Sequence, residues 1–397
     1  MIASTLRRPR IGVDFHTFDG LYQGSRSHLL GLYGAAVALA PEFDFVLFSG
    51  RPEQLAQAHP AFSAPNVRCA ALPHGSRLAR LGWQLGLARR RHSIDLLHVQ
   101  YRLPLWAAGA CACTVHDVLF ETHPQFFSPS FVHMARWTCR TVMRRAALLF
   151  TVSRYSRDEL VRLYGVDPSR IAVTTNGVDA ARFHPAAAPG SAASAAEHQV
   201  LQAHGLVPGS YLCTVGRIEP RKNHLGLLQA YARLRTPRPP LILIGQRDFN
   251  FSPQPVFEAA QALSLGDQVR FLEDADDAAL PVLLRHAMVF AYPTFAEGFG
   301  MPVAEAMASG VPVLTSNNTA LPEVAGDAAV YADPSQAGEI AAALQRMIDD
   351  PVLRGRLIAA GLSRAAALDW QTPASVLVAE LRRHFGAGMA AGPPARR

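Results

Sequence analysis

Short apolar runs alternate with segments of helical periodicity along the whole chain. The apolar runs are unbroken, as in parallel strands buried on both faces, and spacers such as "RSHLLGLYGAAVALA" and "SRDELVRLYG" carry the period of helices. This alternation predicts an α/β protein with doubly wound parallel sheets. The first series of expected strands lies at 10–15, 45–50, 67–72, 95–100, 112–117, 148–153 and 171–178.

The pattern stops once and then starts again. Residues 186–199 are small, polar and aperiodic, which indicates a linker or an exposed excursion. A second series of expected strands follows at 211–216, 241–245, 269–272, 288–293, 311–316 and 328–333. The sequence therefore predicts two Rossmann-like domains, at 1–190 and 200–370, and a C-terminal helix with a frayed tail at 371–397. Two such domains in tandem are expected to leave a ligand cleft between the carboxyl edges of their strands.

Composition narrows the class of protein. The chain has 397 residues, 49% of them hydrophobic and 17% charged, as expected of a folded protein with more than one domain. No apolar stretch is long enough to span a membrane, and the N-terminus does not read as a signal peptide. Five cysteines without a C-x-x-C spacing favour reduced thiols in the cytoplasm.

Basic residues gather in two amphipathic segments. The net charge is +7, and residues 76–92 and 131–145 combine arginines with tryptophan and aliphatic side chains. Such helices can lie on an anionic membrane surface, or can be ordinary helices with one solvated and one packed face. No nucleic-acid-binding module accompanies the positive charge, so a nucleic acid is not an expected partner.

The stretch "EGFGMPVAEAMASG", residues 297–310, follows an expected buried strand. Pro302 suits the first position of a helix, and Gly310 suits the left-handed position just past its end. The helix would then begin at the ligand edge of the sheet, with free amides around Phe299, Gly300 and Met301.

Two carboxylates belong to this junction. Glu297 lies on the loop and Glu305 lies in the first turn of the helix or just beyond it. Acceptor-only carboxylates suit the paired hydroxyls of sugars and ribose, whereas incidental acids at a helix start are equally compatible with the spacing. From the spacing alone, both readings stay open.

A second cluster is "GRIEPRKN", residues 216–223, between a strand and a helix. Arg217 and Lys222 would place two cations near a helix N-terminus, an arrangement that is unfavourable unless an anion binds there. An arginine with a lysine matches a diphosphate. The alternative is that these are surface charges paired with Glu219.

Two candidates lie in the N-terminal half. His116 and Asp117 end a strand, where the histidine could exchange a proton and the aspartate could orient it, or the histidine could be structural. Gly24 and Ser25 precede a helix and make a plausible phosphate-approach turn. This turn is not G-x-G-x-x-G, so a nicotinamide site lacks its fingerprint.

Two further motifs have simpler explanations. Asp274 and Asp276 resemble a D-x-D metal motif, but caps and first-turn acids of a helix explain them, and no metal is expected. Ser156 and Glu159 have the spacing of a capping box, with Ser156 expected at the N-cap.

Jointly, these motifs resemble the family-four retaining glycosyltransferases, which have the GT-B fold of two facing Rossmann-like domains. The resemblance rests on "EGFGMPVAEAMASGVPVLTSNNTALPEVAGDAAVYADP", "GRIEPRKN", "VSRYSRDEL" and "TNGVD", which occur in the family's order. It covers most of the chain from about residue 95 to 370 and is loose in the N-terminal domain. Residues 19–32 lack the Gly-Gly pair that is common in relatives.

The resemblance implies roles for the candidate residues. Arg217 and Lys222 would hold the donor diphosphate, Glu305 would bind the ribose, and Glu297 would grip the transferred sugar. The backbone amides of Phe299, Gly300 and Met301 would assist, Gly24 would close on the phosphate, and His116 with Asp117 would lie near the reaction centre. The route would be a front-face substitution in which the leaving diphosphate helps to deprotonate the acceptor, with no metal or other cofactor.

The function implied is transfer of a sugar from a nucleoside-diphosphate donor to a glycan or lipid-linked acceptor in bacterial surface-polysaccharide synthesis. The His116 stretch resembles mannosyl- and rhamnosyltransferring relatives, which favours GDP-mannose as donor. The enzyme would work in the cytoplasm at the inner face of the membrane, and the C-terminal helix would cross back to the first domain so that the cleft can close. The alternatives are a sugar-nucleotide 2-epimerase on the same fold and a non-catalytic sugar-nucleotide-binding protein.

Overall fold

The chain forms two compact units in a computed structural model. Unit 1 comprises Met1–Gly177 and Trp370–Arg397, and unit 2 comprises Val178–Asp369. The structure describes residues 7–390 except 20–23, 74, 106–108, 246–250, 274 and 276–277.

Unit 1 is built on a seven-stranded sheet in which every pairing is parallel. The strand order is β3-β2-β1-β4-β5-β6-β7, so the direction of winding reverses between β1 and β4. The strands are β1 (Arg10–Asp14), β2 (Asp44–Ser49), β3 (Val67–Ala71), β4 (Leu96–Gln100), β5 (Ala110–Thr114), β6 (Leu148–Thr151) and β7 (Ile171–Val173).

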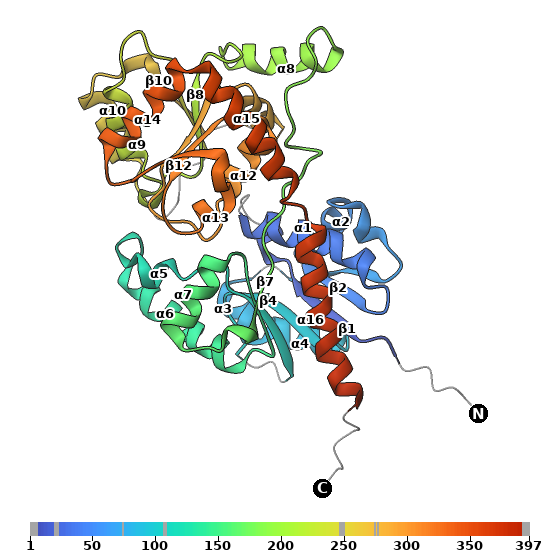
Figure 1. Cartoon of the computed structure of the whole chain (residues 1–397). Helices are drawn as coiled ribbons and strands as arrows, with labels where there is room; N and C mark the ends of the chain where they lie inside the picture. Colours follow the sequence, from blue (N-terminus) through green and yellow to red (C-terminus); the bar gives the residue numbers. More distant parts are fainter. Residues whose placement is uncertain are drawn as a thin grey trace. The chain divides into compact units, whose positions relative to one another are not determined.

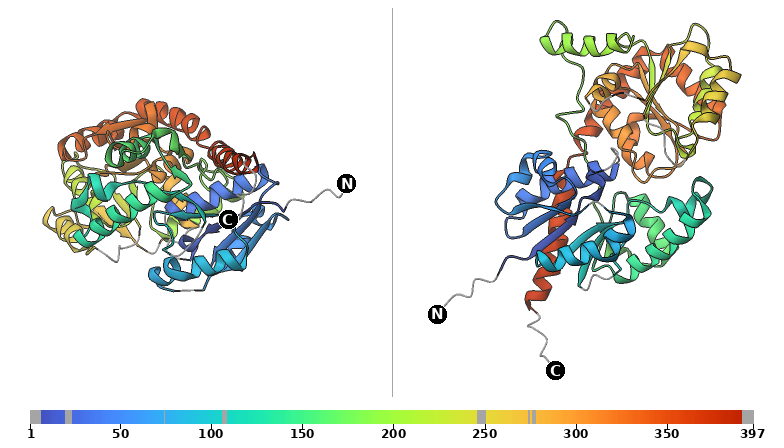
Figure 2. Two further views of the ribbon diagram at one scale, coloured as in Figure 1. Left: turned by 90° about the horizontal axis from the view of Figure 1, so that it is seen from below. Right: turned by 180° about the vertical axis from the view of Figure 1, so that it is seen from behind.

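Helices cover both faces of this sheet (Figure 1; Figure 2). One apolar core joins the sheet to α1 and α16, and a second core on the other face joins it to α4 and α6. The helices of unit 1 are α1 (Gly24–Leu39), α2 (Pro52–Gln57), α3 (Arg77–Ala79), α4 (Leu85–Arg91), α5 (Leu119–Thr122), α6 (Pro129–Arg145), α7 (Arg154–Tyr164) and α16 (Gln371–Ala390).

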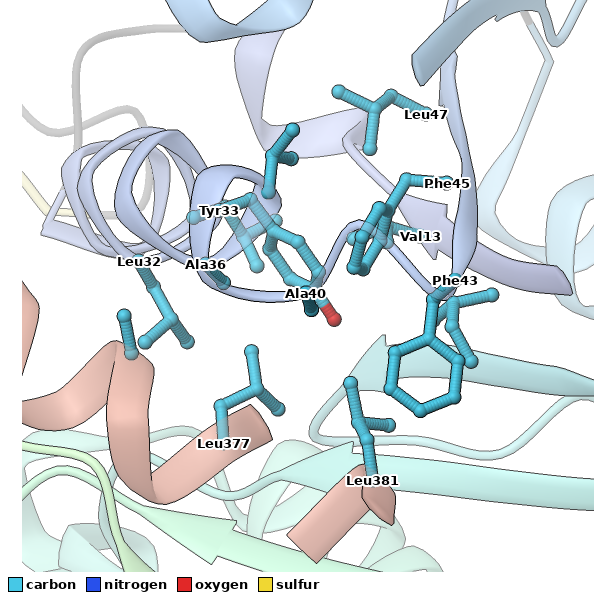
Figure 3. Close-up of a cluster of buried hydrophobic side chains, with 14 of the residues drawn as sticks. Val13, Leu32, Tyr33, Ala36, Ala40, Phe43, Phe45, Leu47, Leu377 and Leu381 are labelled. Carbon is cyan, nitrogen blue, oxygen red and sulfur yellow. The ribbon is translucent and has the colours of Figure 1, made fainter. Parts of the chain in front are cut away.

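The C-terminal helix α16 belongs to unit 1 although the whole of unit 2 precedes it in the sequence. Its side chains Leu377 and Leu381 are buried in the apolar core that α1 and the sheet also line (Figure 3). Leu32 and Phe43 belong to the same cluster. Burial of this apolar stripe stabilises the pairing, at about 1.5–3 kcal/mol for each fully buried leucine.

Unit 2 repeats the architecture with a six-stranded parallel sheet in the order β10-β9-β8-β11-β12-β13. The strands are β8 (Leu212–Val215), β9 (Leu241–Ile244), β10 (Val269–Leu272), β11 (Val289–Tyr292), β12 (Val313–Ser316) and β13 (Ala329–Ala332). The helices are α8 (Ala192–Ala203), α9 (His224–Ala232), α10 (Gln254–Ala262), α11 (Ala279–Arg285), α12 (Met301–Ala308), α13 (Leu321–Ala325), α14 (Ala337–Asp349) and α15 (Pro351–Ala366).

All thirteen expected strands are present, and the prediction of two doubly wound parallel sheets is confirmed. The largest errors are at the ends of two strands. β5 begins two residues before the expected start and ends three residues before the expected end, and β7 ends at Val173, whereas the expected strand runs on to 178. An apolar run indicates that residues are buried, and the chain stays buried beyond the last residue that hydrogen-bonds to the neighbouring strand.

The prediction of a linker at 186–199 is wrong for most of this stretch. α8 begins at Ala192 and ends at Ala203, with the Ser191 side chain accepting from the amide of Ser194 as its cap. Glu197 on this helix is buried and binds Arg285 at 2.7 Å and His286 at 2.9 Å. Alanine has the highest helix propensity, and these long-range ion pairs, which the local pattern cannot show, attach the helix to α11.

The units divide at Gly177–Val178 and Asp369–Trp370, whereas the sequence pattern placed the first boundary between 190 and 200. The expected cap at Ser156 is also wrong. Ser153 is the N-cap of α7, and its hydroxyl accepts from the amide of Ser156. The cap falls three residues earlier because the helix follows β6 almost directly, so that Arg154 already lies in its first turn.

Candidate active site

The candidate residues of unit 2 flank the point where the winding of its sheet reverses. β8 and β11 are neighbours in the sheet although 73 residues separate the end of one from the start of the other. The loop after β8 carries "GRIEPRKN", and the loop after β11 carries Glu297. Both loops leave the carboxyl edge of the sheet at its topological switch point, where ligands bind in open parallel sheets.

Lys222 and Glu297 join these two loops. The Lys222 ammonium donates to Oε1 of Glu297 at 2.8 Å and to the hydroxyl of Tyr292 at 2.7 Å. Tyr292 in turn donates to Oε1 of Glu297 at 3.0 Å. Tyr292 is the last residue of β11, so the rigid strand holds both partners in place.

Arg221 is a part of this network that the sequence analysis missed. Its guanidinium lies 2.8 Å from Oε2 of Glu297 and 2.6 Å from Oε1 of Glu219, and it donates to the carbonyl of Ala296 at 2.6 Å. The signal was present, since "EPRKN" contains a third cation beside Lys222. Arg217 is more exposed than Arg221, and its guanidinium lies 3.8 Å from Oε2 of Glu219.

Asn223 sets the geometry of the "GRIEPRKN" loop. It has a left-handed backbone with φ 58°, and its side chain caps α9 by accepting from the amide of Gly226. Its amide nitrogen donates to the carbonyls of Pro293 and Pro334 at 2.9 and 2.7 Å. One buried asparagine therefore ties the loop after β8 to the loop after β11, which fixes Lys222 opposite Glu297.

The electrostatics favour a bound anion. Burial would raise the pKa of Glu297, but Arg221 and Lys222 outweigh it and lower that pKa to about 2. Burial also lowers the pKa of Lys222, which Glu297 only partly offsets. Ion pairs join Arg217 and Arg221 to Glu219, and Arg221 and Lys222 to Glu297, so three cations gather on one loop at this edge of the sheet.

The helix α12 confirms the expected junction. It begins at Met301 with Gly300 as N-cap at φ 103°, and Pro302 is its second residue. Gly310 has φ 72° one residue beyond the C-cap, as expected of a left-handed terminus. A left-handed N-cap requires glycine here, and it turns the first amides of the helix toward the carboxyl edge of the sheet.

Glu305 and Phe299 are buried on either side of the helix start, with side chains 6% and 5% exposed. The expected sugar, ribose and amide contacts of Glu297, Glu305, Phe299, Gly300 and Met301 stay predictions. Glu297 accepts from three donors with two oxygens that offer about four lone-pair sites. The Glu297 carboxylate therefore holds Arg221 and Lys222 in this structure.

His116 lies in unit 1, two residues past β5, and is buried. Its Nε2 bonds to Oε1 of Gln100 at 2.9 Å, a partner that the sequence did not indicate. Asp117 accepts from the Tyr101 hydroxyl at 3.3 Å and from the amide of Leu119 at 3.2 Å.

His28 packs edge-to-face on His116, with ring centres 4.9 Å apart. It lies on α1, which begins at Gly24, the expected phosphate-approach glycine; residues 20–23 ahead of it lie outside the described residues. Asn176 bonds to Nδ1 of His28 at 2.7 Å. Burial lowers the pKa of His28 to about 4 and that of His116 well below its ordinary value, so both rings are neutral near pH 7.

The candidates thus form two groups, one in each unit. Gly24, His116 and Asp117 belong to unit 1, and Arg217, Lys222, Glu297 and the start of α12 belong to unit 2. Asp274 and Asp276 lie outside the described residues. Among the residues that the structure describes, no group of three or more His, Cys, Asp or Glu side chains could hold a metal ion, and no helix is long and apolar enough to cross a membrane.

The comparison with known proteins agrees with this geometry. Residues 22–182 match the family model "Glycosyltransferase Family 4", and residues 203–364 match "Glycosyl transferases group 1". The chain belongs to the GT-B glycosyltransferases. The resemblance noted from the motifs is therefore confirmed at the level of the family.

This glycosyltransferase is 36% identical to the O-antigen chain mannosyltransferase B of Escherichia coli over 262 residues, which are 65% of this chain and 66% of that protein. It spans little more than half the length of other curated relatives that it matches.

Solved structures share its fold. A sucrose-phosphate synthase of Thermosynechococcus elongatus has a TM-score of 0.75 at 20% identity, over 96% of this chain and all of that chain. The Anabaena protein HepE, solved with UDP and glucose, has a TM-score of 0.73 at 20% identity, over 94% and 100% of the two chains.

Proposed function

We propose that this glycosyltransferase moves a hexose from a nucleoside-diphosphate donor to a hydroxyl of a glycan or lipid-linked oligosaccharide, with retention at the anomeric carbon. The observation that carries the proposal is the cluster at the switch point of unit 2. Glu297 holds Arg221 and Lys222 there, and Arg217 lies on the same loop. A donor diphosphate can pair with the cations of this loop, and the first amides of α12 offer it further donors.

In the proposed reaction the acceptor hydroxyl attacks the anomeric carbon from the side that the diphosphate leaves. The bond from that carbon to the diphosphate oxygen breaks, the new glycosidic bond forms, and the leaving diphosphate takes the hydroxyl proton. Arg217 and Lys222 stabilise the charge that grows on the leaving oxygen. Because these cations serve the leaving group, no metal ion or other cofactor enters the proposal.

GDP-mannose is the proposed donor. The support is the similarity to an O-antigen mannosyltransferase together with the His116 stretch of the sequence. HepE was solved with UDP and glucose, and at 20% identity this likeness carries the fold alone. We place the enzyme in surface-polysaccharide synthesis, in the cytoplasm at the inner face of the membrane, where a lipid-linked acceptor would be met.

Thermal-shift titration with GDP, GDP-mannose, UDP and UDP-glucose tests the donor. A ligand that binds only the folded chain raises its melting temperature, and we expect the guanosine pair to raise it most. Incubation with GDP-mannose and a mannose-terminated acceptor, followed by NMR of the product, should then show an α-linked sugar. Stabilisation by the uridine pair alone would overturn the donor, and an inverted product would overturn the retaining route.

A further inference from the structure

Large apolar side chains are exposed on one side of unit 1. Among the described residues of this unit, six are exposed, and all six lie on the α3–α4 segment, on α6 or on the loop beside them: Leu78, Trp83, Leu87, Leu105, Met134 and Trp137. Trp83 is 57% and Trp137 is 61% exposed. Exposed apolar groups that gather in this way mark an interaction surface more often than scattered ones do.

The six residues share a side because of the packing beneath them. The inward residues of α4 and α6 belong to the same apolar core, on the face of the sheet opposite to α1 and α16. Two helices that cover the same face of a sheet present their outer sides in the same direction. The amide of Leu105 donates to the carbonyl of Leu81 at 2.9 Å, which places this loop against the first of the two helices.

A π-turn brings the apolar residues of the first helix into line. Residues Arg80–Gln84 form a π-helical turn between α3 and α4. In a regular helix, at about 100° per residue, Leu78 and Leu87 would lie on opposite sides. The π-turn takes up about one extra residue, which rotates the later part back by roughly 100° and leaves Leu78, Trp83 and Leu87 within about a quarter turn.

The two segments that carry this surface contain basic side chains and no acidic ones. Neither residues 76–92 nor α6 contains a single Asp or Glu. Exposed arginines lie on both segments: Arg77, Arg90, Arg91, Arg140, Arg144 and Arg145. The sequence predicted Arg89 on the basic face of this segment, and that prediction is wrong. Arg89 is buried and donates to the carbonyls of Ala110 and Asp95.

We propose that this surface of unit 1, formed by α3–α4 and α6, lies on an anionic lipid bilayer. Trp83, Leu87 and Trp137 would enter the headgroup boundary, and the exposed arginines would pair with lipid phosphates. A protein partner with an apolar patch would not require carboxylate-free segments that carry six exposed arginines. The proposal adds a binding surface to the membrane location given under the proposed function. It rests on the proposed function only in that a lipid-linked acceptor gives the enzyme a reason to bind a membrane.

Vesicle flotation of the full-length chain tests the surface without using the donor or the acceptor. We expect it to float with vesicles of phosphatidylcholine and phosphatidylglycerol, and to stay unbound with phosphatidylcholine alone. The double variants Trp83→Ser/Trp137→Ser and Arg90→Glu/Arg91→Glu should each lower the bound fraction about tenfold. Val207→Ser/Val352→Ser and Arg346→Glu/Arg356→Glu, matched exposed changes in unit 2, should leave binding unchanged.

A second measurement needs no variant. Brominated lipids should quench tryptophan fluorescence of the wild-type chain when anionic lipid is present, and added salt should relieve the quenching. If the wild-type chain does not float, or if the unit 2 variants lose binding equally, the proposal is wrong. A dimer in solution that Trp83→Ser dissociates, without any vesicle binding, would assign the surface to a second copy of the chain. Transfer to a soluble acceptor should persist in the surface variants, so a failed flotation leaves the proposed reaction untouched.

Discussion

The Lys222 ammonium lies 2.8 Å from Oε1 of Glu297, although the two residues are 75 positions apart in the chain. They meet because β8 and β11 are neighbours, and because Asn223 ties the two loops that follow these strands. Glu297 thereby fixes the buried Lys222 ammonium at the switch point of unit 2. Arg221 pairs with the other oxygen of the same carboxylate. The first three predictions concern this cluster.

Replacing Lys222 by alanine should reduce turnover by at least ~100-fold, the usual loss when one preorganised charge stabiliser is removed. Steady-state rates with saturating donor measure the effect. Arg235→Ala removes an exposed cation of the same unit, whose partner is Asp349, and should keep the wild-type rate. Near-normal turnover of the Lys222 variant would contradict the diphosphate assignment.

Arg221→Gln should lower kcat about tenfold with a smaller change in the donor KM, because Arg221 acts through Glu297. The same variant should raise the pKa of Glu297, since the arginine is the largest influence that lowers it. Titration of stability against pH would then show the acid transition at higher pH. Arg221→Lys should restore part of both properties; a variant with normal kcat and an unshifted transition would show that Arg221 has no positioning role.

The Glu297 carboxylate should contribute to stability only above acidic pH. Its pKa is about 2 in the fold, below the ordinary value of 4.5, so its contribution is complete above about pH 4.5 and is lost as the pH falls toward 2. Glu297→Gln removes the carboxylate of Lys222 and one of the two carboxylates beside Arg221, and it should destabilise the protein at pH 7. Urea unfolding across this range should show the gap between wild type and variant closing as the pH falls.

The buried histidines of unit 1 should make it lose stability below pH 6.5. Burial lowers the pKa of His28 to about 4 and that of His98 to about 3, from an ordinary 6.5. Between these values the unfolded chain binds protons that the folded chain excludes, so stability falls by up to about 1.4 kcal/mol per pH unit for each ring.

His28→Gln should remove one of these protons and flatten the slope between pH 6.5 and 4. His133→Gln, on the exposed side of α6, serves as the control and should leave the slope unchanged. Hydrogen exchange of amides in β1 and β4 reports on unit 1 separately. Parallel slopes in wild type and the His28 variant would show that this ring titrates normally.

Gly245 should not tolerate a side chain. It has φ 150°, and a Cβ atom there would lie 2.1 Å from the carbonyl oxygen of Gly216 in the loop after β8. Because the obstacle is backbone, Gly245→Ala should cost at least about 2 kcal/mol of the unfolding free energy. Gly355→Ala, inside α15 with open space around it, should instead stabilise by about 0.5–1 kcal/mol. Denaturant unfolding of both variants compares them directly.

Much of the fold was determined by the sequence alone. Most strands follow from a largely apolar run, because a parallel strand covered on both faces must be apolar along its length; the edge strands β3 and β10 each contain an arginine. The start and end of α12 also follow from local chemistry. Gly300 and Gly310 supply the left-handed backbone at its two ends, and Pro302 suits its first turn. Such signals are local, so no knowledge of distant contacts is needed to recognise them.

The tertiary structure decided which of the candidates meet and what each one holds. Glu297 could not be assigned to Arg221 and Lys222 from the sequence, because only the adjacency of β8 and β11 brings the loops together. The helix α8 could not be predicted from the sequence either. Its alanine-rich stretch resembles a linker, and only the tertiary structure shows that Glu197 forms an ion pair with Arg285.

The outward line of Leu78, Trp83 and Leu87 also depends on the three-dimensional structure. Their spacing in the sequence disperses them around a regular helix, and one π-turn collects them on a single side. The sequence fixes which groups are available through local periodicity and propensity. Only the packed structure decides their partners, because hydrogen bonds, ion pairs and shared faces join residues whose separation along the chain carries no signal of their meeting.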